Sequence, residues 1–267
     1  MSRMKFTKMV ASGNDFIVID KTSGRLSALA VKLCDRRFGI GADGLLVLEE
    51  ARGAGADFRM RIFNPDGSEP SMCGNGARCI ALYAFKNKIA KKDMVFETLA
   101  GNIAAHVKGN SVKVKMSNPA GIKCNIPLTI GGKKLSVHRI NTGVPHVVYF
   151  TDNLDRVDVS GLGRPIRYHK KFAPAGTNVN FVETLGKNKI KIRTYERGVE
   201  GETLACGTGS AASAIISALY KDAKAPVGVL TRSGEVLSVY FKKLGSKFSE
   251  LYLEGSVKVV FNGEVLT

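Results

Sequence analysis

The sequence has no tryptophan, and aromatic residues make up only 7% of its 267 positions. Flat side chains on which nucleic-acid bases can stack are therefore sparse. The longest weakly polar run, Ala211 to Tyr220, is too short to span a bilayer, and the N-terminal MSRMKFTKMV lacks the apolar stretch of a signal peptide. We therefore expect a cytoplasmic protein without a membrane partner.

Cysteine pairs and blocks of like charge are also missing. The five cysteines form no C-x-x-C pair, and an odd, widely spaced set indicates neither a disulfide framework nor a zinc site. Lysine and arginine (40) outnumber aspartate and glutamate (23), which gives a net charge of +17. This charge is dispersed along the chain and nowhere forms a run of five like-charged residues, so we predict a solvated surface and no nucleic-acid partner. Because of the cysteine spacing we also expect no metal.

The sequence does contain an internal repeat of about half its length. Four stretches recur: Ser12–Val18 as Thr142–Val148, Phe38–Glu49 as Phe172–Glu183, Glu69–Gly76 as Glu202–Gly209, and Val95–Val107 as Val229–Tyr240. The offsets run from 130 (Ser12 to Thr142) to 134 (Phe38 to Phe172). A nearly constant offset predicts one domain duplicated end to end.

Strand signals dominate both copies, because β-branched and aromatic residues recur in short runs. The predicted strands are Met4–Val10, Phe16–Asp20, Leu45–Glu49, Phe58–Phe63, Ile103–Val107 and Ser111–Met116, then Val147–Phe150, Val179–Val182, Lys189–Tyr195, Val227–Thr231 and Leu237–Phe241. Two stretches, Gly76–Lys88 and Gly209–Lys221, are apolar on nearly every side and predict a buried helix in each copy.

The expected fold class is α+β, with two pseudo-symmetric domains, each a mixed or antiparallel strand roll around a central buried helix. A turn-rich break at Ser117–Gly121 separates residues 1–118 from residues 119–255. We expect the C-terminal strand, residues 256–267, to join the first domain.

Each copy carries a Cys-Gly-x-Gly turn, at Cys73 and at Cys206, directly before its predicted helix. Glycines leave backbone N–H groups uncovered, and these groups, with the positive end of the helix dipole, favour a bound carboxylate. The same field favours thiolate over thiol. Two such thiols on opposite sides of one α-carbon would remove a proton from one face and deliver a proton to the other. Cys34, Cys79 and Cys124 fit the plainer interpretation of small hydrophobic residues.

Three motifs accompany these turns: GNDFIVID at Gly13–Asp20, MCGNGARC at Met72–Cys79 and YERGVEGETLACGTG at Tyr195–Gly209. With them the chain resembles the diaminopimelate epimerase family over nearly its full length. The asparagine that follows Cys-Gly, Asn75, resembles the pattern of this family, whereas the related proline racemases usually carry histidine at that position. The resemblance implies a homodimeric, cofactor-independent isomerase that interconverts LL- and meso-2,6-diaminopimelate in lysine and peptidoglycan precursor synthesis.

The resemblance also implies roles for individual residues. Cys73 and Cys206 are then the acid/base thiols, and His146 and Glu196 tune them by proton exchange. Taken alone, His146 fits a strand-edge histidine equally well. The implied substrate contacts are Asn14, Asn64, Gly74, Asn75, Asn178, Glu196, Arg197, Gly207 and Thr208. Arg197 has independent physical support, because a guanidinium grips a carboxylate with two parallel bonds and the substrate has a second carboxylate.

Two positions depart from the family pattern: Val144 stands where asparagine commonly precedes Pro-His, and Gly44 where some members carry glutamine. Val144 and the shared paired thiols leave a proline- or hydroxyproline-type racemase as an alternative. A basic nucleic-acid-binding protein is a second alternative, based on net charge alone. A redox sensor is a third, because two facing thiols could close into a disulfide.

Overall fold

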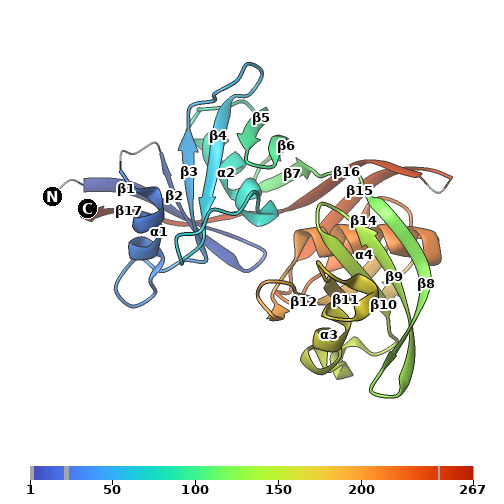
Figure 1. Cartoon of the computed structure of the whole chain (residues 1–267). Coiled ribbons are helices and arrows are strands. Elements are labelled where there is room, and N and C mark those ends of the chain that lie inside the picture. Colours follow the sequence, from blue (N-terminus) through green and yellow to red (C-terminus); the bar gives the residue numbers. More distant parts are fainter. Residues whose placement is uncertain (1–2, 21–23, 246, 267) are drawn as a thin grey trace. The chain divides into compact units, whose positions relative to one another are not determined.

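The computed structural model describes residues 3–20, 24–245 and 247–266 (Figure 1). In these ranges 17 strands accompany four α-helices and two short 3-10 helices, so the chain is a mixed α/β protein dominated by strands. Its contacts divide it into two compact units, one made of residues up to Val114 and from Gly255 onward, the other of Lys115–Glu254. None of the helices in the described ranges has the length and apolar character of a membrane span.

The first unit is built on a mixed sheet. Its strands, in order of pairing, are β17 (Lys258–Leu266), β1 (Arg3–Ala11), β2 (Asn14–Asp20), β3 (Gly44–Glu49), β4 (Phe58–Phe63), β5 (Asp93–Thr98), β6 (Gly101–Lys108) and β7 (Ser111–Lys115). The pairs β2–β3 and β4–β5 are parallel, and the others are antiparallel. The C-terminal strand thus lies beside the N-terminal one.

The second unit repeats this series of pairings. Its strands, in order, are β8 (Ala120–Ile130), β9 (Lys133–Asn141), β10 (Pro145–Phe150), β11 (Asn178–Gly186), β12 (Lys189–Glu196), β14 (Val227–Leu230), β15 (Val236–Leu244) and β16 (Lys247–Ser256), with the short β13 (Gly201–Thr203) on β12. Here β10–β11 and β12–β14 are parallel, again the third and fifth pairs of the series.

One apolar helix packs against the strands of each unit. In the first, α2 (Gly74–Lys86) contacts β1, β2, β3, β4 and β6, and in the second, α4 (Gly207–Tyr220) contacts β9, β10, β11, β12, β14 and β15. The run Ala77–Ala84 in α2 and the run Gly209–Ala218 in α4 are buried throughout. Both predicted helices are therefore confirmed, and each begins directly after its cysteine.

Smaller helices complete the chain: α1 (Leu26–Cys34), α3 (Val159–Arg167), and the 3-10 turns η1 (Leu154–Arg156) and η2 (Lys170–Phe172). The residues of α1 pack with β1, β2 and β3 in the core of the first unit. In the second unit α3 packs on β11 and β12 around Phe181 and Tyr195. Beneath these helices, most residues of β2 and β3 and the first five residues of β11 are buried.

Gly44, one of the two departures from the family pattern, has a packing reason. It opens β3, where an added Cβ would lie 3.1 Å from the carbonyl oxygen of Phe63 and 3.3 Å from the ring of Phe16. A longer side chain would have to displace that ring. The neighbouring core therefore favours glycine at this position.

Candidate active site

Cys73 is the N-cap residue of α2, and its carbonyl oxygen accepts the N–H of Ala77 at 2.8 Å. The two glycines of this turn have different surroundings. A Cβ on Gly74 would meet nothing within 4 Å, whereas one on Gly76 would press on Leu46 at 3.0 Å. Gly76 therefore lets the helix pack on the sheet, and Gly74 leaves open space beside the first backbone N–H groups. That space is where an anion would bind at a helix N-terminus.

Asn75 and Asn14, both predicted substrate contacts, are held together by a side-chain hydrogen bond. Asn75 Nδ2 donates to Asn14 Oδ1 at 2.7 Å, and Asn14 Nδ2 donates to Asp43 Oδ2 at 2.9 Å. On the other side, the fully buried Arg78 donates to Asn75 Oδ1 and, at 2.9 Å, to Ser12 Oγ. The orientation of both amides is thereby fixed. Arg78 and Ser12 were not predicted from the sequence, because they lie 66 residues apart.

An ion cluster anchors the start of β2 next to Asn14. Asp15 contacts Lys8 at 2.7 Å and Arg36 at 2.7 Å, and Arg36 also contacts Asp43 at 2.7 Å. Burial by itself would raise the pKa of Asp15, but the hydrogen bonds from Arg36 and Lys8 lower it to about 2. Asp15 therefore stays ionised at neutral pH and keeps this cluster closed.

Asn64, a further predicted contact, is engaged locally. It follows β4, its Nδ2 donates to Ser68 Oγ at 2.9 Å, and its backbone N–H donates to the carbonyl oxygen of Ser68 at 2.8 Å. Among the described residues, no hydrogen bond or ion pair joins Asn64 to Asn14 or Asn75. Its role as a substrate contact stays a prediction.

Cys206 is the N-cap residue of α4 and is 6% exposed. Its sulfur accepts the N–H of Gly209 at 3.4 Å and lies 3.4 Å from Thr208 Oγ1. Thr142 Oγ1 holds the turn by donating to the carbonyl oxygen of Thr208 at 2.9 Å. An N–H donor and the helix dipole therefore both act on this sulfur, and both favour its thiolate form.

His146 lies on β10, which pairs with β9 on one side and β11 on the other, so the strand-edge interpretation is wrong. The ring is completely buried, and burial, assisted by the charge of Arg197, lowers its pKa to about 3. His146 is therefore neutral at physiological pH.

Asn180 decides which nitrogen of His146 carries the proton. Its Nδ2 donates to the carbonyl oxygen of Val147 at 2.9 Å and lies 3.1 Å from His146 Nδ1. Because that amide nitrogen is a donor, Nδ1 accepts, and the proton of the neutral ring is assigned to Nε2. Within the described residues Nε2 has no hydrogen-bond partner. His146 thus holds a buried N–H donor for which the described part of the chain supplies no acceptor.

Asn180 also connects His146 with the cysteine turn. Its Oδ1 accepts from Thr194 Oγ1 at 3.0 Å, and a Cβ on Gly209 would lie only 2.3 Å from it. The amide therefore packs directly on the first turn of α4. Asn180 was not predicted as a site residue, and its signal in the sequence is only that a polar residue interrupts the apolar run of β11.

Asn178, Glu196 and Arg197 gather at the ends of β11 and β12. Asn178 Oδ1 accepts the backbone N–H of Arg197 at 2.8 Å, and Arg197 Nη1 donates to the carbonyl oxygen of Ala175 at 3.2 Å. Glu196 Oε2 accepts from Thr203 Oγ1 at 2.8 Å. Burial raises the pKa of Glu196 above its ordinary value, although the bond from Thr203 opposes the shift. A carboxyl group with a raised pKa exchanges protons more readily near neutral pH.

The predicted residues thus lie in two groups, one in each unit: Cys73, Gly74, Asn75 and Asn14 in the first, and Cys206, Gly207, Thr208, His146, Asn178, Glu196 and Arg197 in the second. The other cysteines differ in their surroundings. Cys34 and Cys79 are buried and Cys124 is exposed, and none of them caps a helix N-terminus.

Comparisons with known proteins identify the family that the sequence matches. The family model described as diaminopimelate epimerase matches residues 6–121 and 139–260. The chain is 44% identical to the diaminopimelate epimerase of Aquifex aeolicus, over 98% of each chain. It is also 44% identical to that of Caldanaerobacter subterraneus, over 98% of this chain and 99% of the relative.

Two solved structures share the fold at low sequence identity. A phenazine biosynthesis protein of the PhzF family from Bacillus anthracis matches with a TM-score of 0.75 at 20% identity, over the full length of both chains. A probable proline racemase from Agrobacterium radiobacter matches with a TM-score of 0.71 at 13% identity, over 98% of this chain and 93% of that one.

Proposed function

Since the chain belongs to the diaminopimelate epimerase family, we propose that it interconverts LL- and meso-2,6-diaminopimelate with Cys73 and Cys206 as the acid/base pair. One thiolate takes the α-proton from one face, and the opposite thiol gives its proton to the other face. One C–H bond breaks and one forms, so the product differs from the substrate only in the configuration of this carbon.

The first turns of α2 and α4 are the proposed site for the carboxylate on the reacting carbon. Gly74 and Asn75 open one helix, and Gly207 and Thr208 open the other. Backbone N–H groups there would stabilise the negative charge that develops when the α-proton leaves, because they point at the carboxylate and need no reorientation. Arg197, with Asn14, Asn64 and Asn178, is our proposal for holding the distal end of the substrate.

His146 and Glu196 take different parts in this proposal. Because His146 is neutral with its proton on Nε2, it acts as a hydrogen-bond donor and does not accept the substrate proton. Glu196, whose pKa burial raises, is better suited to exchange protons with solvent between turnovers. Proton exchange is therefore assigned to Glu196, and stabilisation of a thiolate to His146.

The layout that goes with this chemistry is a pair of duplicated domains, residues 1–118 with 256–267 and residues 119–255, each with its buried helix at the centre. It is supported by the identical series of strand pairings in the two units, with parallel pairs at the third and fifth steps. A duplicated layout provides one cysteine at the equivalent position of each domain. The proposed reaction needs two such acid/base groups, one for each face of the α-carbon.

The observation that carries the proposal is the repeated N-cap cysteine. Cys73 (φ −140°, ψ 120°) and Cys206 (φ −126°, ψ 112°) have nearly the same backbone conformation, and each is followed by glycine and a buried helix. A cysteine that only packs in a core has no physical reason to occupy the N-cap position of a buried helix in both units.

Hydrogen exchange tests the mechanism. In deuterated water with LL-diaminopimelate, the meso product should carry deuterium at the inverted carbon, because the delivering thiol has equilibrated with solvent. Cys73→Ser and Cys206→Ser should each lower epimerisation by roughly a thousand-fold or more. The exposed Cys124→Ser is the matched control and should keep wild-type turnover. Product without label, or full activity in either serine variant, would refute the two-thiol mechanism.

A further inference from the structure

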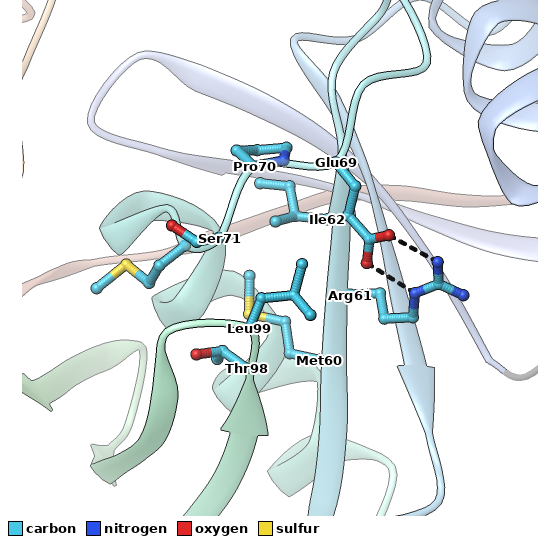
Figure 2. Close-up of a pocket in the computed structure, with 9 residues that line it drawn as sticks. Met60, Arg61, Ile62, Glu69, Pro70, Ser71, Thr98 and Leu99 are labelled. Atoms are coloured by element: carbon cyan, nitrogen blue, oxygen red, sulfur yellow. Dashed lines mark hydrogen bonds and ion pairs between the residues drawn. The ribbon is translucent and has the colours of Figure 1, made fainter.

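An arginine–glutamate pair lies at the start of the loop Glu69–Met72, which directly precedes Cys73. Arg61, on β4, donates from Nε to Glu69 Oε1 and from Nη2 to Glu69 Oε2, both at 2.7 Å (Figure 2). Two parallel bonds between a planar guanidinium and a carboxylate fix both groups in position and orientation. The third nitrogen, Nη1, lies 3.3 Å from Glu49 on β3, so the arginine is itself tied to the sheet.

The second unit contains the same pair at the equivalent place. Arg193, on β12, donates from Nε to Glu202 Oε1 and from Nη2 to Glu202 Oε2, again both at 2.7 Å. Here Nη1 donates to the carbonyl oxygens of Leu154 at 3.2 Å and Val157 at 2.9 Å. We call these two pairs the forks.

Each fork holds the chain four residues before a cysteine, at Glu69 before Cys73 and at Glu202 before Cys206. A second tie lies two residues before each cysteine. The N–H of Ala100 donates to the carbonyl oxygen of Ser71 at 3.2 Å, and that of Ser233 donates to the carbonyl oxygen of Leu204 at 2.9 Å. Beyond each cysteine the helix begins, so each cysteine lies on a short segment fixed at both ends.

Residues of the first of these loops line a narrow pocket together with residues of the neighbouring strands. This pocket has no room for a water molecule. Figure 2 shows Pro70 and Ser71 of the loop on one side of it and Met60 and Leu99 on another. The loop is therefore held by the packing around this pocket, by the fork and by the backbone tie.

The side chains of both forks are largely shielded from water, which strengthens the interaction between their charges. The side chains of Arg61 and Glu69 are each 23% exposed, and those of Arg193 and Glu202 are 14% and 22% exposed. The bonds from Arg61 hold the pKa of Glu69 below its ordinary value, so the fork stays charged at neutral pH. Charge-assisted bidentate bonds in such a setting are stronger than exposed ion pairs.

We propose that the Arg61–Glu69 and Arg193–Glu202 forks are separate positioning devices, each of which sets the place of one reactive cysteine, Cys73 or Cys206. The roles of the cysteines rest on the proposed function; the effect of each fork on its own cysteine does not. A small displacement of a reacting group costs much of the rate, so the forks should affect turnover more than substrate affinity.

Lysine substitutions test the forks in the full-length protein. Arg61→Lys and Arg193→Lys keep the positive charge but cannot form the two parallel bonds. Alkylation by iodoacetamide at pH 7 is followed at each cysteine by peptide mass spectrometry. We expect alkylation of Cys73 alone to slow by roughly three-fold or more in Arg61→Lys, because a displaced sulfur loses the field of the helix N-terminus. Arg193→Lys should slow Cys206 alone.

Each variant carries its own control, since the cysteine of the other unit should react at the wild-type rate. Arg232→Lys is the matched control for the second fork, because Arg232 lies 3.7 Å from Glu202 without forming parallel bonds, and both cysteines should keep their rates. In both fork variants kcat for epimerisation should fall by about ten-fold or more, with a much smaller change in KM.

Equal slowing at both cysteines, or an unchanged or faster rate at the cysteine next to the altered fork, overturns the proposal. Should an arginine variant fail to fold, Glu69→Gln and Glu202→Gln remove the charge of the fork while keeping its shape, and the same outcomes apply. Alkylation needs no substrate, so a failure of the proposed function leaves this test intact.

Discussion

Complete burial sets the charge of His146 and makes the protein sensitive to acid. The folded ring takes up a proton only near pH 3, whereas the unfolded ring does so near 6.5. Between these values the unfolded state binds more protons, so the free energy of unfolding falls as pH falls through this window. Asp15 affects stability at lower pH. Its pKa is lowered from 3.8 to about 2 on folding, so the stability that it adds is present above pH 3.8 and is lost as the pH falls toward 2.

Removing the histidine should therefore flatten the pH dependence of stability between pH 6 and pH 4. In His146→Gln the free energy of unfolding should decline less steeply than in the wild type, by about 1 kcal/mol per pH unit. Urea unfolding at pH 4, 5 and 6 measures both slopes, and the contribution of His138, also buried, is common to both proteins. Identical slopes would show that His146 is not held neutral by the fold.

The glycines of the two cysteine turns should differ sharply in tolerance. A Cβ on Gly209 would meet Asn180 Oδ1 at 2.3 Å, whereas one on Gly74 would meet nothing within 4 Å. Gly209→Ala should therefore displace the Asn180 amide and lower the free energy of unfolding by about 1–3 kcal/mol. Gly74→Ala should leave stability within about 0.5 kcal/mol of the wild type. Thermal unfolding compares them, and equal losses would contradict the packing described for Asn180.

At the scale of elements, the small residues of α2 and α4 allow the strands to close around an apolar helix. Ala81 of α2 is completely buried, whereas Ala28 of α1 is exposed. Ala81→Leu should destabilise the protein by about 1–3 kcal/mol through overpacking, and Ala28→Leu should change stability little. Chemical unfolding measures the free energy of unfolding of both variants. An unchanged value for Ala81→Leu would mean that α2 is packed loosely.

The elements predicted from the sequence are those with a strong local signal. The strand at Phe58–Phe63 was placed at its observed bounds, and both buried helices were found from their apolar runs. Helix α3 was missed because its sequence contains Gly161, Gly163 and Pro165. Its helical form depends on tertiary packing, since a Cβ on Gly163 would lie 2.6 Å from Tyr195. The largely exposed β8 lacks the alternation that indicates a strand.

At the scale of the whole molecule, the repeat in the sequence revealed more than any single motif. It drew attention to Cys73 and Cys206 because they occupy equivalent positions, and the structure caps one buried helix with each. The partners that orient the candidate site residues were not predictable, since Arg78 reaches Ser12 and Asn180 reaches His146 across 66 and 34 positions. Such contacts depend on the register of strands, which composition and spacing do not specify. The homodimer stays a prediction.

A crystal structure of the reduced protein with a substrate analogue would locate both sulfur atoms relative to one α-carbon. We expect the Sγ atoms of Cys73 and Cys206 to lie on opposite faces of that carbon, each within about 3–3.5 Å of it. A complex in which either sulfur lies out of reach of the α-carbon, or in which both approach the same face, would contradict epimerisation by two thiols.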